Sequence, residues 1–289
     1  MTDRIEFEGH GGIRLAGDVR GPKGAPAVLL LHGGGQTRYS WGGTADVLAE
    51  LGYRAYTLDS RGHGESHWAP DGQYALGAFA RDTLAVLQAI VGPVHLVGAS
   101  LGGLTGLLLL GEVAPGAAQS LVLVDVVPHF ERVGADRISD FMTSKMHIGF
   151  GSLEEAAAAI AEYNPHRPPP RDYRGLAKNL RERDGRWYWH WDPAFVSGGP
   201  ADSGVRGNAP NEINDRERMT AASQNIDVPM LLVRGRASDL VTEEAAQAFL
   251  ADVPQCEFVD VSGAGHMVAG DRNDAFTSAV VGFLGRIAA

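Results

Sequence analysis

The chain has 289 residues, of which 44% are hydrophobic, so it can bury a large core. Its formal net charge is −10 at pH 7, so a nucleic-acid partner is not expected. Its single cysteine, Cys256, excludes an internal disulfide framework and a cysteine-based zinc cluster. We expect a cytoplasmic protein without a membrane span, because the N-terminus lacks an apolar signal core and no apolar stretch reaches the roughly 18 residues that a span needs.

Short apolar runs alternate with helix-like segments along most of the chain. This alternation predicts an α/β fold with a mostly parallel, doubly wound sheet. An antiparallel hairpin is expected first, at residues 5–7 and 13–19. The later strands are expected at residues 27–31, 54–58, 94–97, 121–125, 230–233 and 257–261. The helices that cover them are expected at residues 41–51, 76–90, 104–110, 243–250 and 274–287.

The alternation stops between Pro128 and Asn225, where no buried strand is evident. Three stretches in this region look helical, and the second opens with a capping box, Ser152-x-x-Glu155. These stretches are residues 132–146, 152–163 and 171–181. We therefore expect residues 1–128 and 226–289 to form the core, and residues 129–225 to form a helical lid. Such a lid would lie over the C-terminal ends of the strands, where open α/β sheets bind ligands.

The stretch Gly98-Ala99-Ser100-Leu101-Gly102 lies directly between a predicted strand and a predicted helix. This is the setting of a nucleophile elbow, in which a serine is held in a strained turn and glycines on either side prevent clashes. The pattern alone is weak evidence in a chain with 38 glycines. Its position between strand and helix favours Ser100 as a nucleophile.

A serine hydroxyl needs a histidine to take its proton and a carboxylate to orient that histidine. In elbow-type enzymes the three follow in the order serine, acid, histidine. His266, in a glycine-containing loop after the last predicted strand, is the best candidate for the base. Two carboxylates are candidates for the acid. We favour Asp239, in the loop after residues 230–233, and keep Asp125, at the end of the strand before the lid, as the alternative.

An acyl-transfer transition state carries an oxyanion, which needs two hydrogen-bond donors. The backbone N–H of Leu101 is the first candidate, because it follows the serine. The second is expected from the loop His32–Gln36, where glycines let the backbone approach a ligand closely. Gly34 is our first choice in this loop and Gly35 the second.

Several motifs, in this order along the chain, resemble those of the α/β-hydrolase superfamily, in its serine-nucleophile, esterase- and lipase-like branch. They are His32-Gly33-Gly34-Gly35, the stretch from Asp59 to Ser66, Gly98 to Gly103, Ser238-Asp239 and Gly265-His266. The resemblance covers nearly the whole core. It implies that Asp59, Arg61 and His63 shape a turn rather than take part in catalysis. A serine at the elbow disfavours the haloalkane dehalogenases and epoxide hydrolases, which use an aspartate there.

Aromatic residues in the predicted lid are candidates for a substrate pocket. If residues 187–191 are extended, three indoles lie on one face and could wall an apolar pocket, with Trp187 and Trp189 the first candidates. Anchoring of the lid to the core is the alternative role for these residues. From the core side, Trp41 and His129 are further candidates for the pocket.

These observations predict a serine hydrolase that cleaves a small, mainly uncharged carboxylic ester, lactone or thioester through an acyl-enzyme. No cofactor or metal is implied, and the expected partner is a small-molecule substrate. Two other reactions remain possible on the same residues: hydrolysis of a carbon–carbon bond, and cofactor-free perhydrolysis or acyl transfer. A non-catalytic, ligand-binding relative is the alternative from another class.

Overall fold

The computed structural model describes residues 2–163, 173, 175–197, 215–266 and 274–287. Eight strands form one sheet in the order β1-β2-β4-β3-β5-β6-β9-β10. They are β1 (Asp3–Glu8), β2 (Arg14–Arg20), β3 (Ala27–Leu31), β4 (Arg54–Leu58), β5 (Val94–Ala99), β6 (Ser120–Val124), β9 (Met230–Gly235) and β10 (Cys256–Val261). Strand β2 pairs antiparallel with β1 and β4, and the strands from β4 to β10 are parallel. The predicted mostly parallel α/β sheet is confirmed.

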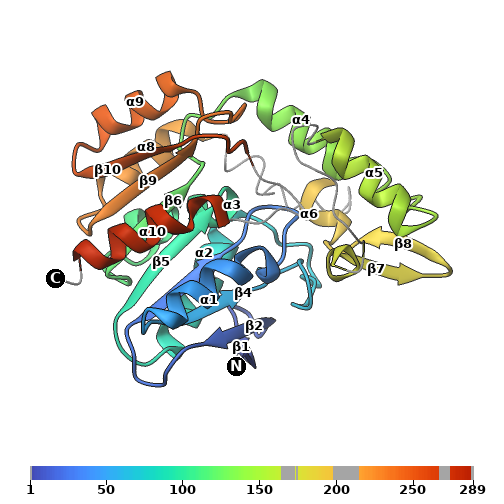
Figure 1. The fold of residues 1–289 in the computed structure, drawn as a ribbon, viewed down its shortest axis with the longest axis horizontal. Coiled ribbons are helices and arrows are strands. Elements are labelled where there is room, and N and C mark those ends of the chain that lie inside the picture. The colour runs from blue at the N-terminus through green and yellow to red at the C-terminus, as the bar shows by residue number, and fades with distance from the viewer. Residues whose placement is uncertain (1, 164–172, 174, 198–214, 267–273, 288–289) are drawn as a thin grey trace.

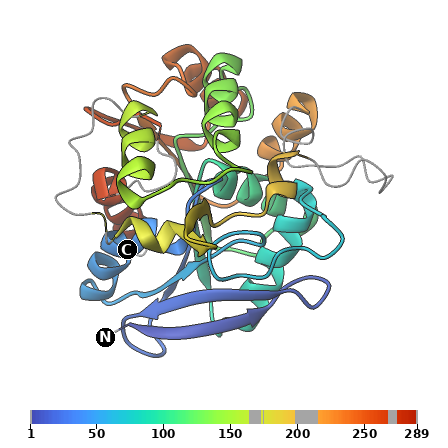
Figure 2. The ribbon, with the colours of Figure 1, turned by 90° about the vertical axis from the view of Figure 1, so that its right-hand side faces the viewer.

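Helices cover both faces of this sheet (Figure 1; Figure 2). One face packs against α1 (Gly42–Glu50) and α10 (Asp274–Ile287), and the other against α2 (Leu76–Ala89), α3 (Leu101–Leu108) and α9 (Glu243–Asp252). Strand side chains alternate between the two resulting cores. In β3, Leu29 and Leu31 belong to one core, and Val28 and Leu30 to the other.

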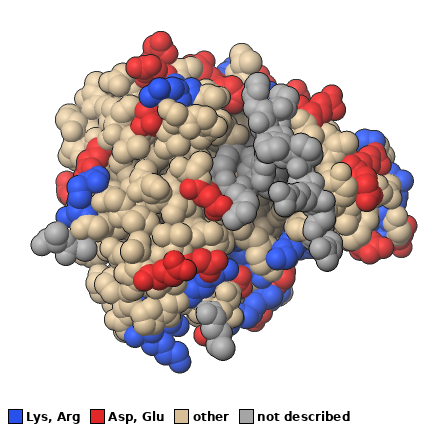
Figure 3. All heavy atoms as spheres, in the orientation of Figure 1, with Lys and Arg blue, Asp and Glu red and all other residues tan. Residues whose placement is uncertain are grey.

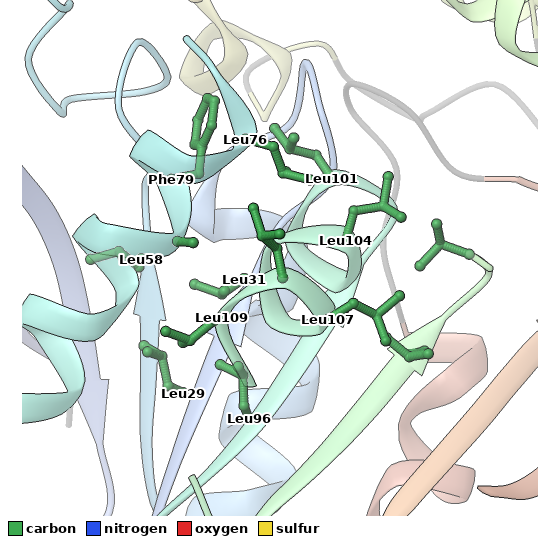
Figure 4. Close-up of a cluster of buried hydrophobic side chains, with 14 of the residues drawn as sticks. Leu29, Leu31, Leu58, Leu76, Phe79, Leu96, Leu101, Leu104, Leu107 and Leu109 are labelled. Carbon is green, nitrogen blue, oxygen red and sulfur yellow. The ribbon is translucent and has the colours of Figure 1, made fainter. Parts of the chain in front are cut away.

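Helix α3 lies at the centre of the larger core. Figure 4 shows leucines of this helix, among them Leu104 and Leu107, close to Leu31 of β3 and Leu96 of β5. All four are buried. Burial of one such side chain contributes about 1.5–3 kcal/mol to stability. This packing fixes the start of α3, and therefore the turn that precedes it, against the sheet.

The segment between β6 and β9, which we call the inserted segment (residues 129–225), has its own elements. They are α4 (Arg132–Thr143), α5 (Leu153–Tyr163), η3 (Leu176–Asn179), β7 (Leu180–Arg183), β8 (Arg186–Trp189), α6 (Pro193–Ser197) and α8 (Arg216–Gln224). Figure 1 shows α4, α5, α6 and the β7–β8 hairpin together on one side of the molecule. Helix α8 instead packs on the core, where a Cβ at Gly111 would lie 1.9 Å from the Ala222 carbonyl oxygen.

The helix predicted over residues 171–181 was wrong in its described part, which contains the single turn η3 and the start of β7. The cause is the dipeptide Asp184-Gly185, which follows β7. Both residues have positive φ, 52° and 71°, so they form a two-residue turn that pairs β7 with β8 in antiparallel fashion. The two other helices predicted in the inserted segment are present as α4 and α5.

The surface carries charges of both signs. Figure 3 shows acidic and basic side chains interspersed with broad uncharged areas on the face where α1 and α10 lie. Among the described helices, none has the length and apolar character needed to cross a bilayer.

Candidate active site

Ser100 occupies the turn between β5 and α3. Its φ of 46° and ψ of −113° are unusual for a residue with a side chain, and its N–H donates to the Val124 carbonyl at 3.1 Å. A Cβ at Gly98 would lie 2.3 Å from the carbonyl carbon of Gly102, and one at Gly102 would lie 2.5 Å from the Leu31 oxygen. The two glycines are therefore required for the tight turn that presents the serine, as an elbow needs.

The His266 ring lies beside a buried carboxylate. Its Nδ1 is 2.8 Å from Asp125 Oδ2, and both side chains are almost fully buried. Asp125 Oδ1 also accepts from the N–H of Gly235 at 3.0 Å, and its Oδ2 accepts from the Ser238 hydroxyl at 2.7 Å. With Nδ1–H donating to Asp125, Nε2 of His266 is the ring nitrogen left to act as a base.

Asp239, the favoured acid, lies elsewhere. Its carboxylate pairs with Arg137, with Oδ2 2.7 Å from Nη1, and both side chains are largely exposed. The expectation that Asp239 lies beside His266 is therefore wrong, and the alternative carboxylate, Asp125, occupies that place. The physical reason lies at the end of β6, where Asp125 takes a positive φ of 52°. Aspartate tolerates this left-handed conformation better than most residues with a side chain.

The loop after β3 faces the same region. Gly34 lines one cavity together with Ser100 and Leu101. The N–H of Gly35 is already used, because it donates to His63 Nε2 at 3.1 Å. Leu101 is the first residue of α3, so its N–H has no partner within the helix. The geometry thus favours Gly34 over Gly35 as the neighbour of the Leu101 N–H.

The cavity has a volume of about 650 Å³ and reaches both Ser100 and His266. Its inner lining is apolar and buried: Leu101, Leu104, Val126, Met142, Phe195 and Leu240. Its outer lining is polar and exposed: Arg132, Asp136, Ser139 and Arg216. The inserted segment supplies most of the outer lining and part of the inner one, through α4, α6 and α8.

The four aromatic residues expected at the pocket are not among the described residues that line it, so this expectation was wrong. Trp41 is fully buried in the core between the sheet, α1 and α10. His129 is exposed and contacts Thr220 through Nε2 at 2.9 Å. Trp187 packs against the larger core, and the Trp189 ring stacks on Trp191 with centroids 4.8 Å apart. The packing of these two tryptophans fits the alternative that the aromatic stretch 187–191 anchors the inserted segment.

The model for the alpha/beta hydrolase family matches residues 28–279. The chain belongs to this family. This hydrolase is 31% identical to the esterase Rv0045c of Mycobacterium tuberculosis over 98% of its own length and 89% of that protein's. It is 28% identical to the 3-hydroxybutyrate-oligomer hydrolase of Cupriavidus necator, over 88% and 87% of the two chains.

Solved structures agree with this assignment. A refined structure of the M. tuberculosis esterase Rv0045c has a TM-score of 0.73 at 28% identity, covering 99% of this hydrolase and 92% of that chain. The crystal structure of E-2-(acetamidomethylene)succinate hydrolase has a TM-score of 0.81 at 21% identity, covering 99% of this hydrolase and 100% of that chain. At that lower identity the likeness shows the fold alone.

Three buried histidines of the hydrolase lie in or beside the loop after β3: His32 belongs to it, and His63 and His190 contact Gly35. Burial lowers the pKa of His32 to about 4 and that of His63 to about 3, and it also lowers the pKa of His190. The rings accept hydrogen bonds from backbone N–H groups: Ser60 donates to His32 at 3.0 Å and Gly64 donates to His190 at 2.7 Å. These neutral rings join the loop after β3, the turn after β4 and, through His190, the inserted segment.

Proposed function

We propose that this hydrolase cleaves carboxylic esters through an acyl-enzyme on Ser100, with His266 as general base and acid and Asp125 as the residue that orients it. The observation that carries the proposal is the 2.8 Å contact between His266 Nδ1 and Asp125, with the Ser100 elbow in the cavity that His266 also lines. The names of the relatives, an esterase and an oligomer hydrolase, support ester cleavage.

The reaction follows from the roles of these groups. His266 Nε2 takes the proton of the Ser100 hydroxyl while the Ser100 Oγ attacks the ester carbonyl carbon. The resulting oxyanion accepts hydrogen bonds from the N–H groups of Leu101 and Gly34. His266 then gives the proton to the departing alcohol, and water hydrolyses the acyl-enzyme in the same way. Asp125 stays ionised throughout and stabilises the transient imidazolium.

The cavity also bears on substrate size. Its volume of about 650 Å³ is in the range of pockets for small molecules rather than for polymers. The apolar inner lining, with Leu104, Met142 and Phe195, fits an uncharged group bound next to Ser100. A lactone or thioester of similar size presents the same carbonyl chemistry to these residues.

An active-site-directed fluorophosphonate tests the proposal. We expect wild-type protein to be labelled at Ser100, and Ser100→Ala to lose both labelling and at least about a thousandfold in kcat toward an activated ester. Ser139→Ala is the matched control, because it removes another hydroxyl from the same cavity and should remain labelled. Absence of labelling in folded wild-type protein would contradict the proposal. Labelling without turnover of any ester would favour a ligand-binding relative.

A further inference from the structure

Ser238 connects the loop after β9 to the carboxylate of Asp125. Its hydroxyl donates to Asp125 Oδ2 at 2.7 Å, while its Oγ accepts from the N–H groups of Leu240 at 3.2 Å and Val241 at 3.1 Å. Because both neighbouring N–H groups occupy the acceptor side of Oγ, the hydroxyl proton points to Asp125. The serine is thus fixed in its own loop and oriented toward another strand.

We propose that Ser238 is a positioning residue that holds Asp125 in the orientation needed by His266, an inference that rests on the proposed function. Ser238 and His266 both donate to Oδ2 of Asp125, and the Gly235 N–H donates to Oδ1. Donors on both oxygens prevent the carboxylate from rotating. Bonds to a carboxylate are roughly twice as strong as those between neutral groups. Removal of the hydroxyl leaves His266 as the remaining side-chain donor to Oδ2 and therefore holds Asp125 less firmly against the imidazole.

A double-mutant cycle tests this role. Ser238→Ala should lower kcat toward an activated ester about tenfold, equivalent to about 1.4 kcal/mol, with KM little changed. In an Asp125→Ala background the same substitution should change kcat less than about twofold, because the group on which it acts is absent. Ser238→Thr, which keeps the hydroxyl, should recover most of the wild-type kcat.

Ser223→Ala is the matched control, because Ser223 is a buried serine whose hydroxyl donates to the Thr220 carbonyl within α8. It should leave kcat unchanged in both backgrounds. Equal losses from Ser238→Ala with and without Asp125 would assign Ser238 a role in the fold of its loop and overturn the proposal. If Asp125→Ala itself has no effect on kcat, the assignment of Asp125 as the acid in the proposed function is wrong, and this outcome is distinct from a failure of the Ser238 role alone.

A second, independent observation concerns the outer lining of the cavity. The charged side chains of this outer lining are Arg132, Asp136 and Arg216, so it holds two guanidinium groups and one carboxylate, although the whole chain has a net charge of −10. Among the described residues, no carboxylate pairs with either arginine, whereas the neighbouring Arg137 pairs with Asp239 and Arg218 with Glu112.

Neither arginine stabilises the helix in which it lies. Arg132 is the first residue of α4 and Arg216 the first residue of α8, and positive charges near a helix N-terminus oppose the helix dipole. Arg216 also donates through Nη2 to the Phe130 carbonyl at 3.2 Å, which holds it near the start of α4. A positively charged outer wall above an apolar inner wall fits a substrate with an anionic end.

We infer that the preferred substrate is an ester that carries a second, ionised acid group, bound by Arg132 and Arg216 while the ester carbonyl reaches Ser100. This inference also rests on the proposed function, and it differs from the expectation of a mainly uncharged ester. An exposed arginine pair attracts a carboxylate at close range even on an acidic protein, because salt screens the more distant charges.

Matched pairs of esters test the inference. The first pair is monomethyl glutarate and its terminal amide, in which the charge of the acid lies on the acyl side. The second pair is 4-acetoxybutyrate and its amide, in which the charge of the acid lies on the alcohol side. We expect kcat/KM to favour the charged member of at least one pair by about tenfold, and Arg132→Gln with Arg216→Gln to remove that preference. Asp136→Asn should increase it.

Arg137→Gln is the control, since Arg137 pairs with Asp239 and is not among the described lining residues. It should leave the preference unchanged. Equal kcat/KM for charged and neutral esters in both pairs would overturn the inference while leaving ester hydrolysis intact. Absence of turnover of any ester would instead contradict the proposed function.

Discussion

Asp125→Asn is expected to lower kcat about 10⁴-fold, whereas Asp239→Asn should keep most of the activity. The asparagine amide can turn its NH₂ group toward His266 Nδ1, which stabilises the tautomer with a proton on Nε2. That tautomer cannot take the proton of Ser100. Asp239 by contrast pairs with Arg137 in an exposed ion pair, which is worth at most about 1 kcal/mol.

The measurement is kcat toward an activated ester for both variants, with thermal unfolding to confirm that each is folded. Asp239→Asn is the matched control, because it makes the same chemical change at the carboxylate first expected to be the acid. The opposite ranking of the two variants would return the role of the acid to the loop after β9. Equal, small effects would mean that neither carboxylate orients His266 during turnover.

The fold of the core could be predicted from the sequence because its signals are local. Apolar runs such as Ala27–Leu31 are buried on both faces, as in a parallel sheet covered by helices on both sides. The Ser100 turn was also predictable, since the glycines at positions 98 and 102 are required by close backbone contacts. In both cases a few adjacent residues determine the structure.

The choice of acid could not be made in the same way. Asp125 and Asp239 both follow parallel strands, so either could approach a histidine on the last loop. What separates them is the backbone conformation after each strand: Asp125 turns into the site with a positive φ, while Asp239 turns out toward Arg137. Ser238 was within a recognised motif, but its role depends on which carboxylate it meets.

The cavity was the least predictable part of the site. Its inner wall includes Met142 and Phe195, which are far apart in the sequence and meet only through the folding of the inserted segment. The tryptophans near residue 189 gave a stronger compositional signal, yet they pack among themselves and against the core. Aromatic content therefore did not identify the pocket, which required the tertiary structure.

The second large expected effect concerns the buried ion pair between Arg38 and Asp59, which joins the loop after β3 to the turn after β4. Both side chains are almost fully buried, and Asp59 also accepts from the N–H groups of Arg38 at 2.7 Å and Glu65 at 2.9 Å. Burial alone would lower the pKa of Arg38, but Asp59 and Asp18 raise it above its ordinary value. The guanidinium therefore stays charged inside the protein.

Arg38→Met is expected to lower the free energy of unfolding by about 3–5 kcal/mol, because it leaves the Asp59 carboxylate buried without its cation. Burial raises the pKa of Asp59 even with Arg38 present, and the loss of the cation raises it further. An acid whose pKa is higher in the folded chain than in the unfolded one stabilises the fold less as pH rises. The deficit should therefore be larger at about pH 8 than at about pH 5.

Denaturant unfolding at the two pH values measures this deficit. Arg236→Met is the matched control: the Arg236 side chain is 63% exposed and its Nε lies 3.0 Å from Asp260 Oδ2, so its loss should cost at most about 1 kcal/mol. Arg38→Lys, which keeps the charge, should recover part of the stability. A deficit for Arg38→Met that is no larger than that of Arg236→Met, or that shrinks as pH rises, would show that Asp59 does not depend on Arg38 for its charge inside the protein.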